Sequence, residues 1–161
     1  MSKVLVVYHS RSGNTAKMAE AVAEGAKNSG ADVVLKEVDE ATLEDLTAAD
    51  GVVFGAPTYF GTLSGEMKSF IDKSVRIRGK LENKVGAAFT SSGSLSGGNE
   101  TTLISMIEAM LIHGMIIVAD PIETGGHYGA VAVGAPDAEA LKTCTKLGER
   151  VAKFVKLIAS A

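Results

Sequence analysis

The sequence is poor in residues that crosslink or stiffen a chain: its 161 residues include one cysteine, three prolines and no tryptophan. A single cysteine excludes an intramolecular disulfide framework and a cysteine-based zinc knuckle, so we expect a cytoplasmic protein. Sixteen basic residues against 19 acidic ones leave no positive excess for coating a nucleic acid. No apolar run reaches the ~18 residues that a membrane span needs.

The sequence does have an ordinary apolar content and many glycines. Hydrophobic residues make up 46% of the chain and the net charge is only −3, which argues against disorder. The length suits one domain, which we place at residues 1–161. Eighteen glycines indicate many places where the backbone approaches something closely.

Short apolar runs alternate with helical patterns along the chain. The runs are continuous and rich in β-branched residues, as in strands buried on both faces, and they span residues 4–8, 33–35, 51–56, 85–89 and 115–119. Apolar residues at a 3.6-residue spacing predict helices over about 14–28, 63–71 and 103–111, and from near 137 to 158. Residues 38–50 are less regular, and we interpret them as a loop with one helical turn around 42–46.

This alternation predicts an α/β fold, a three-layer sandwich with helices on both faces of a five-stranded parallel sheet. We expect the doubly wound strand order 2-1-3-4-5, with a ligand at the carboxyl ends of strands one and three. The glycine-rich segment 120–136 follows strand five, so we place it on the same carboxyl edge.

The loop after the first strand has the composition of an anion cradle. It reads Ser10-Arg11-Ser12-Gly13-Asn14-Thr15 and comes directly before a predicted helix. A helix N-terminus offers unpaired N–H groups and a positive dipole end, hydroxyl groups add donors, and Gly13 lets the backbone curl around an anion. The alternative is a plain helix cap by Ser12 or Asn14, although a cap needs only one such residue.

Other motifs that this architecture can carry are absent. The sequence has neither the G-x-x-x-x-G-K-[ST] of P-loop NTPases nor a G-x-G-x-x-G after the first strand, and it has no G-x-S-x-G elbow. A response regulator would need acidic residues where strands one and three end, and those ends read Tyr8-His9-Ser10 and Ala56-Pro57-Thr58. The histidine spacing suggests no metal site.

Two further loops on the expected carboxyl edge suit a flat heterocycle. Residues 55–65 place Tyr59 and Phe60 between glycines, and residues 90–99 are almost all small and polar. Small residues let main-chain N–H and C=O groups reach the edge of a ring, while aromatic side chains cover its face. A phosphate, a flat ring and many backbone hydrogen-bond partners together indicate flavin mononucleotide (FMN).

These segments resemble a known family. Residues 10–15 resemble the FMN phosphate loop of flavodoxins. The WrbA-type NAD(P)H:quinone oxidoreductases, which are flavodoxin-like FMN enzymes, are similar in segments that keep their order along essentially the whole chain: 57–61, 64–72, 91–100, 113–115 and 128–130. The connections between strands two and three, and between the second helix and strand four, are shorter than in that family, where they help to form a tetramer and an active-site wall.

The resemblance implies a role for each loop. The FMN phosphate would be held by Ser10, Arg11, Ser12, Gly13, Asn14 and Thr15. The isoalloxazine would be lined by Pro57, Thr58, Tyr59, Phe60 and Gly61. Its pyrimidine end and the ribityl chain would be bound by Ser91, Ser92, Gly93, Gly97 and Gly98, and Tyr128 is a further cofactor-binding candidate. The catalytic candidates are Tyr59, His127 and His113, the last of which a neighbouring subunit could present.

Several residues have a second interpretation. His113 ends a predicted helix, where a cation would complement the helix dipole. For His9 we favour packing within the first loop. Cys144 falls on the buried stripe of the last helix, so we expect no redox role for it. A basic cluster is either a solvated turn or a site for the phosphates of NAD(P)H, and it comprises Lys73, Arg76, Arg78 and Lys80.

Two main functions follow. In the first, an FMN enzyme takes a hydride from NAD(P)H and passes electrons to a quinone or similar acceptor. In the second, a flavodoxin-type carrier moves single electrons between protein partners, and the acidic stretch 37–50 would steer a basic partner. A flavin-binding module without turnover is a third option. By resemblance we expect a homo-oligomer, a dimer or tetramer, in which exposed apolar residues such as Ile77 or Leu95 contact a partner.

Overall fold

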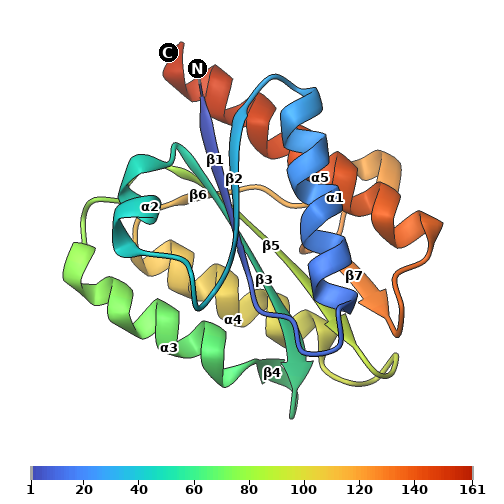
Figure 1. Cartoon of the computed structure of the whole chain (residues 1–161). Coiled ribbons are helices and arrows are strands. Elements are labelled where there is room, and N and C mark those ends of the chain that lie inside the picture. The colour runs from blue at the N-terminus through green and yellow to red at the C-terminus, as the bar shows by residue number, and fades with distance from the viewer. Residues whose placement is uncertain (1, 161) are drawn as a thin grey trace.

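Strands and helices alternate along the chain (Figure 1). The structure, a computed structural model, describes residues 2–160. The strands are β1 Lys3–Tyr8, β2 Asp32–Glu37, β3 Gly51–Tyr59, β4 Thr62–Leu63, β5 Val85–Ser92, β6 Ile116–Ile117 and β7 Ala130–Val133. The helices are α1 Asn14–Asn28, α2 Leu43–Ala48, α3 Gly65–Lys73, α4 Asn99–Ile112 and α5 Ala138–Ala159, with short 3₁₀ helices η1 Ser74–Ile77 and η2 Ile122–Thr124.

The main strands form a parallel sheet in the order β2-β1-β3-β5-β6. This confirms the predicted order 2-1-3-4-5, with β5 and β6 in the fourth and fifth places. The fifth place is shared, because β7 also pairs in parallel with β5, from Phe89↔Ala130 to Ser92↔Val133. A hairpin adds β4, which runs antiparallel to the end of β3. Two residues are too few to show a strand period, so no sequence pattern predicts β4.

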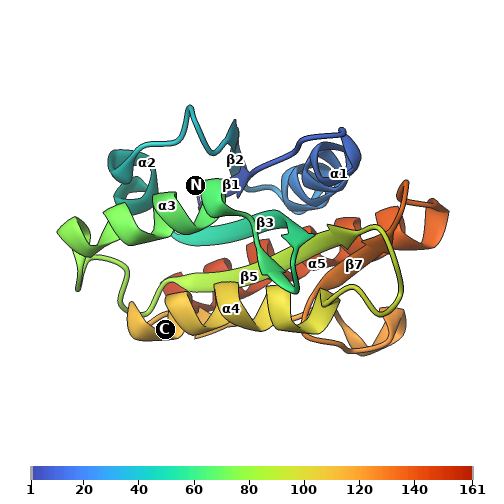
Figure 2. The ribbon, with the colours of Figure 1, turned by 90° about the horizontal axis from the view of Figure 1, so that it is seen from below.

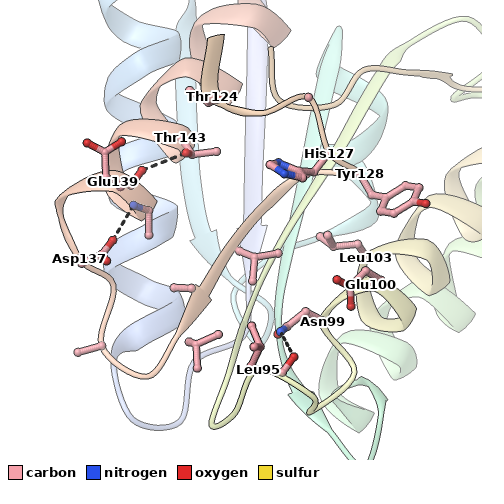
Figure 3. Close-up of a pocket in the computed structure, with 17 residues that line it drawn as sticks. Leu95, Asn99, Glu100, Leu103, Thr124, His127, Tyr128, Asp137, Glu139 and Thr143 are labelled. Carbon is pink, nitrogen blue, oxygen red and sulfur yellow. Dashed lines mark hydrogen bonds between the residues drawn. The ribbon is translucent and has the colours of Figure 1, made fainter. Parts of the chain in front are cut away.

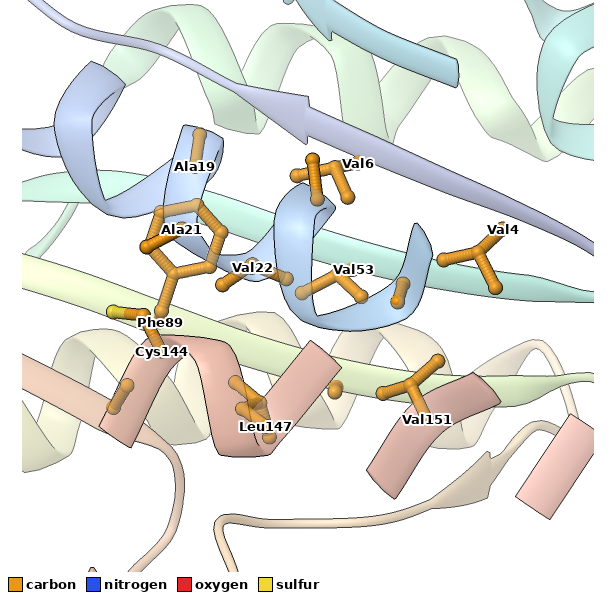
Figure 4. Packing of buried hydrophobic residues seen from close by; sticks show 14 of the residues in the cluster. Val4, Val6, Ala19, Ala21, Val22, Val53, Phe89, Cys144, Leu147 and Val151 are labelled. Carbon is orange, nitrogen blue, oxygen red and sulfur yellow. The ribbon is translucent and has the colours of Figure 1, made fainter. Parts of the chain in front are cut away.

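Helices cover both faces of the sheet, as predicted (Figures 1 and 2). One face carries α1 and α5, whose apolar residues meet Val4, Val6 and Phe89 in one buried cluster (Figure 4). The other face carries α2, α3 and α4, which bury a second cluster with Leu5 and Val7. Successive residues of β1 thus belong to opposite clusters, which explains why its sequence is a continuous apolar run.

α1 and α5 pack closely at two glycines, each of which lies against the backbone of the other helix. A Cβ on Gly25 would overlap the carbonyl oxygen of Thr145, and a Cβ on Gly148 would overlap the carbonyl oxygen of Val22. Cys144 lies beside this contact and is fully buried, as predicted, and burial raises the pKa of its thiol to about 12. Because the thiolate is the reactive form, burial and a raised pKa both lower the reactivity of this thiol.

The segment 120–136 differs from the prediction. It contains η2 and β7 instead of only irregular loop, and β7 starts level with Phe89, three residues before the end of β5. His127 and Tyr128, which precede β7, therefore lie beside the middle of β5 and not at its carboxyl end. The prediction failed here because a four-residue strand next to glycines has no clear period.

A helix boundary and one expected exposure also differ. Residues 43–48 form α2, which a capping box between Thr42 and Asp45 starts, so the helix runs past the predicted turn. Ile77 is buried, so its expected exposure was wrong, whereas Leu95 is 83% exposed, as expected. Within residues 2–160, no helix combines the length and the apolar composition needed to cross a membrane.

Replacing Gly148 by alanine is expected to destabilise the fold by about 1–3 kcal/mol, because the new methyl group forces α1 and α5 apart. Helix propensity alone would make the same substitution stabilising by about 1 kcal/mol, so the sign of the change tests the contact. Urea denaturation measures it. Gly65→Ala is the control, because Gly65 also lies in a helix but a Cβ there meets open space. We expect that variant to be neutral or stabilising, by at most about 1 kcal/mol, and equal effects at both positions would contradict the close packing.

Candidate functional site

Three loops come together where the central strands end. The register pairs Tyr8 with Gly55 and Pro57 with Ser91, so the loops after β1, β3 and β5 share one edge of the sheet (Figure 1). The Oγ1 of Thr15 and the Oγ of Ser91 lie 2.7 Å apart in buried surroundings. The first and third loops are therefore in direct contact.

The first loop, residues 10–15, bends around one serine. Gly13 adopts the left-handed conformation (φ 92°) at the N-cap of α1, where it supplies no side-chain cap. The Oγ of Ser10 instead accepts hydrogen bonds from the N–H groups of Gly13 (3.2 Å) and Ala16 (3.1 Å). The plain cap that was the alternative for Ser12 or Asn14 is therefore not formed.

The same loop leaves backbone donors unused. Within residues 2–160, the N–H groups of Ser12, Asn14 and Thr15 have no hydrogen-bond partner. The space that a Cβ of Gly13 would occupy is open. Unpaired N–H groups at the positive end of a helix dipole attract anions, so this loop has the geometry that an anion cradle needs.

The second loop turns at Phe60 and Gly61, both of which have positive φ (48° and 82°). Positive φ at both central residues is the geometry of a two-residue type I′ hairpin, which here joins β3 to β4. A bulky residue rarely adopts this conformation, and Phe60 is also fully exposed, at 109%. Its ring stands away from the core, where it can cover a planar ligand.

α4 holds the tip of this hairpin in place. The Oγ1 of Thr101 donates a hydrogen bond to the carbonyl of Gly61, and the hydroxyl oxygens of Thr62 and Ser105 lie 3.0 Å apart. Gly98 (φ 105°) approaches so closely that a Cβ on it would lie 2.6 Å from the Cα of Gly61. The second and third loops therefore touch through their backbones.

A network of threonines lies beneath these loops. The Oγ1 of Thr58 lies 3.1 Å from that of Thr90 and 2.9 Å from that of Thr102, and Thr90 donates to the carbonyl of Ala56 (2.7 Å). These contacts tie β3, β5 and α4 together under the site. Of these threonines, only Thr58 was predicted as a site residue. Thr90 fell within the predicted third loop without a role of its own, and Thr101 and Thr102 were not predicted. The sequence pattern that could have indicated Thr101 and Thr102 is a pair of threonines in the first turn of a helix that follows a glycine-rich loop.

The third loop exposes its main chain, and the polar side chains beneath it are buried. Ser91 and Ser92 are buried at the end of β5, whereas Gly93 is exposed and has open space where a Cβ would lie. The Oγ of Ser92 donates to the carbonyl of Ser94 (2.9 Å), which tightens the loop. At its far end Asn99 is buried, and the side-chain oxygen of Asn99 has no partner within the described residues.

The structure thus gathers most of the predicted cofactor-binding residues on one edge of the sheet. Those gathered are Ser10, Arg11, Ser12, Gly13, Asn14, Thr15, Pro57, Thr58, Tyr59, Phe60, Gly61, Ser91, Ser92, Gly93, Gly97 and Gly98. His9 packs among them, as expected: its Nδ1 lies 2.9 Å from the Oγ of Ser64, and its ring meets Tyr59 edge to face at 6.2 Å.

His113 lies at the opposite end of α4 from these loops. The 14 residues of α4 separate it from Gly98 by ~21 Å. Its Nε2 lies 2.7 Å from the Oγ of Ser74, which itself donates to the carbonyl of Ile71 (2.6 Å), so Nε2 is the donor. Burial lowers the pKa of His113, and the Arg78 guanidinium lowers it further. A neutral imidazole does not complement a helix dipole, so the cationic alternative is not supported.

His127 and Tyr128 line a separate pocket of ≈ 810 Å³ beside β7 (Figure 3). The N–H and the Nδ1 of His127 lie 2.9 Å and 3.2 Å from the carboxylate oxygens of Asp120, whose side chain is fully buried. Leu95 and Asn99 bring the third loop to this pocket, but no residue of the first or second loop lines it. His127 and Tyr128 are therefore not brought together with the anion cradle.

The basic cluster is a solvated turn in the structure. It lies at the end of α3 and in the residues after it, and all its members are exposed: Lys73, Arg76, Arg78 and Lys80. Two of them, Lys73 and Arg76, line a shallow pocket with the acidic residues Asp39 and Glu66. This mixture of charges agrees with the solvated-turn interpretation.

Comparison with known proteins agrees with the fold. A family model described as a flavodoxin domain matches residues 5–111. The protein named NAD(P)H dehydrogenase (quinone) from Archaeoglobus fulgidus is 40% identical over 188 residues, covering 97% of this chain and 98% of its own. The protein named flavodoxin from Aquifex aeolicus is 43% identical over 164 residues, covering 98% of this chain and 89% of its own.

Solved structures are similar along their whole length. The WrbA-like flavodoxin from Agrobacterium tumefaciens matches with a TM-score of 0.86 at 34% identity, over 98% of this chain and 99% of the other. A flavodoxin from the domain Archaea matches with a TM-score of 0.82 at 31% identity, over 96% of this chain and 99% of the other. The resemblance seen in the sequence is confirmed, and the chain belongs to the flavodoxin family.

Proposed function

We propose that this chain is an FMN-dependent oxidoreductase that passes electrons from NAD(P)H to a quinone or similar acceptor. The observation that carries the proposal is the cradle of unpaired N–H groups in residues 10–15, set beside the Phe60 hairpin and the exposed main chain of the third loop. The name of the relative from Archaeoglobus fulgidus, NAD(P)H dehydrogenase (quinone), supports the choice of donor and acceptor.

The residues present suit FMN. Its phosphate would be held by the N–H groups of residues 12, 14 and 15 and by the neighbouring hydroxyls, at the positive end of α1. Its ring would lie against Tyr59 and Phe60, with the pyrimidine edge toward the main chain of residues 91–98. Glycines at positions 13, 61 and 93 leave open the space that side chains would fill there.

When bound, FMN supplies the capacity to accept a hydride from a nicotinamide and to give two electrons to an acceptor. The protein's own part is binding and orientation. Main-chain N–H groups of the third loop would stabilise negative charge on the reduced ring, because fixed dipoles need no reorganisation. The threonine network under the loops, with Thr58 at its centre, would keep these donors in place.

We also propose that the protein is a cytoplasmic homo-oligomer. The outer face of α4 exposes the apolar side chains of Ile104, Leu111 and Ile112, and apolar side chains grouped on a surface are typical of a contact with another chain. His113 lies near this face and far from its own loops, so it would act on a flavin only in a neighbouring copy. Tyr59 is the catalytic candidate within the loops, whereas His127 lies in the separate pocket beside β7.

A second candidate function is that of a flavodoxin-type carrier of electrons between proteins. The relative from Aquifex aeolicus bears the name flavodoxin at 43% identity. In the acidic stretch the carboxylate-bearing residues Asp39, Glu40 and Glu44 are exposed, which would favour the approach of a basic protein partner.

Steady-state kinetics tests the first function against the second. FMN-loaded protein with NADH or NADPH and 1,4-benzoquinone should oxidise the nicotinamide faster than the same concentration of free FMN. A rate equal to that of free FMN would contradict the enzyme. If, in addition, anaerobic dithionite titration accumulates one-electron-reduced flavin, the carrier is the better description.

Gly13→Ala should weaken FMN binding by at least about tenfold, because the alanine opposes the left-handed turn and its Cβ occupies the cradle. Fluorescence titration of FMN measures the affinity. Gly79→Ala is the matched control: Gly79 has a similar φ (+87°) and open space around it, but it lies in a turn far along the chain from the loops. Both variants should lose about 1–2 kcal/mol of stability, and equal FMN affinity in both would argue against the cradle.

A further inference from the structure

A second large groove lies at the other end of α1. It has a volume of ≈ 960 Å³ and is bounded by the C-terminal half of α5, by Ser29 after α1, and by Pro121 and Glu123 after β6. The 15 residues of α1 separate this groove from residues 10–15 by ~22 Å. None of its lining residues belongs to the three loops, so the groove is separate from the proposed FMN site.

Basic side chains line this groove at helical spacing. They are Lys146, Arg150, Lys153 and Lys156 of α5. Residues three and four apart lie on the same face of a helix, so these four cations form one row along the groove.

Most of this positive charge is not neutralised by carboxylates. Arg150 Nη1 donates to the main-chain carbonyl of Asp120 (3.1 Å), and Lys156 Nζ donates to the main-chain carbonyl of Ser29. A carbonyl accepts a hydrogen bond but carries no net charge. Within residues 2–160, Lys153 makes no hydrogen bond or ion pair.

Lys146 is the exception in this row. Its Nζ lies 2.8 Å from a carboxylate oxygen of Glu149 and 3.7 Å from one of Glu123. With four cations and these two carboxylates in the lining, the groove keeps a net positive charge. It is therefore suited to an anion that carries more than one charge.

An apolar wall accompanies the charges. The Arg150 guanidinium lies over the ring of Phe154, 5.6 Å from its centroid, and Leu157 is 51% exposed in the same groove. Pro121 adds further apolar surface to the lining of the groove. A concave site that combines fixed cations with aromatic and aliphatic surface suits a ligand with an anionic end and a planar or apolar end.

We propose that this groove binds an organic phosphate, with the phosphates on Arg150, Lys153 and Lys156 and the planar part on Phe154 and Leu157. Guanidinium groups bind phosphate oxygens through paired, charge-assisted hydrogen bonds. Lys156 also meets the negative end of α1, but an ammonium has three donors and the Ser29 carbonyl uses one of them. This inference goes beyond the proposed oxidoreductase, whose chemistry does not involve the groove.

The test is a residue-resolved NMR titration, with ATP and with tripolyphosphate, of FMN-loaded protein from which free FMN has been removed. Amide shifts on α5 report the groove directly, so the result does not depend on whether FMN occupies the cradle. We expect saturable shifts at residues 146–157, with tighter binding of ATP because only ATP has a planar part. Shifts confined to residues 10–15, or no shifts on α5 at millimolar concentrations of either probe, would overturn the proposal.

Two variants on α5 separate a defined site from general charge attraction. Lys153→Gln should weaken ATP binding about fivefold, since one charge-assisted contact is lost. Lys142→Gln removes the same charge from the same helix but outside the groove, where Lys142 pairs with Glu139, and it should leave the affinity unchanged. Both side chains are largely exposed, so neither change should disturb folding. Equal weakening by the two variants, or equal affinity for the two probes, would overturn the assignment.

Discussion

The parallel pairing of β1, β3 and β5 is the constraint on which the rest of the structure depends. Each strand is buried on both faces, so its residues must be apolar almost without interruption and helices must cover both sides. The register then brings the ends of the strands, at Tyr8, Pro57 and Ser91, to one edge. A slip of one residue would exchange the faces of a strand and separate the loops that now touch.

Backbone conformation, more than charged side chains, defines the site on that edge. Gly13, Phe60, Gly61 and Gly98 all have positive φ, and all of them lie in the three loops. The unpaired N–H groups that result are donors of fixed direction at the end of α1, whose dipole adds to their field. A phosphate site of this kind needs no lysine, so a net charge of −3 on the chain does not conflict with the proposed site.

Much of the fold and of the loop cluster could be predicted from the sequence, because buried strands, amphipathic helices and glycine-rich turns leave local patterns. The order of the strands, the start of α1 at Asn14 and the three loops were predicted in this way. The place of His113 at the end of a helix was predicted, whereas the position of His127 could not be, since it depends on the register of the short strand β7. The threonine network was also missed, because it joins residues 32 and 44 positions apart.

The central claim is that residues 10–15 hold the phosphate of FMN, and calorimetric titration with FMN and with riboflavin tests it most directly. The two ligands share the same ring and differ in the phosphate alone. If the cradle binds that phosphate through several charge-assisted hydrogen bonds, FMN should bind at least about 100-fold more tightly than riboflavin. Equal affinities for the two flavins would contradict the account.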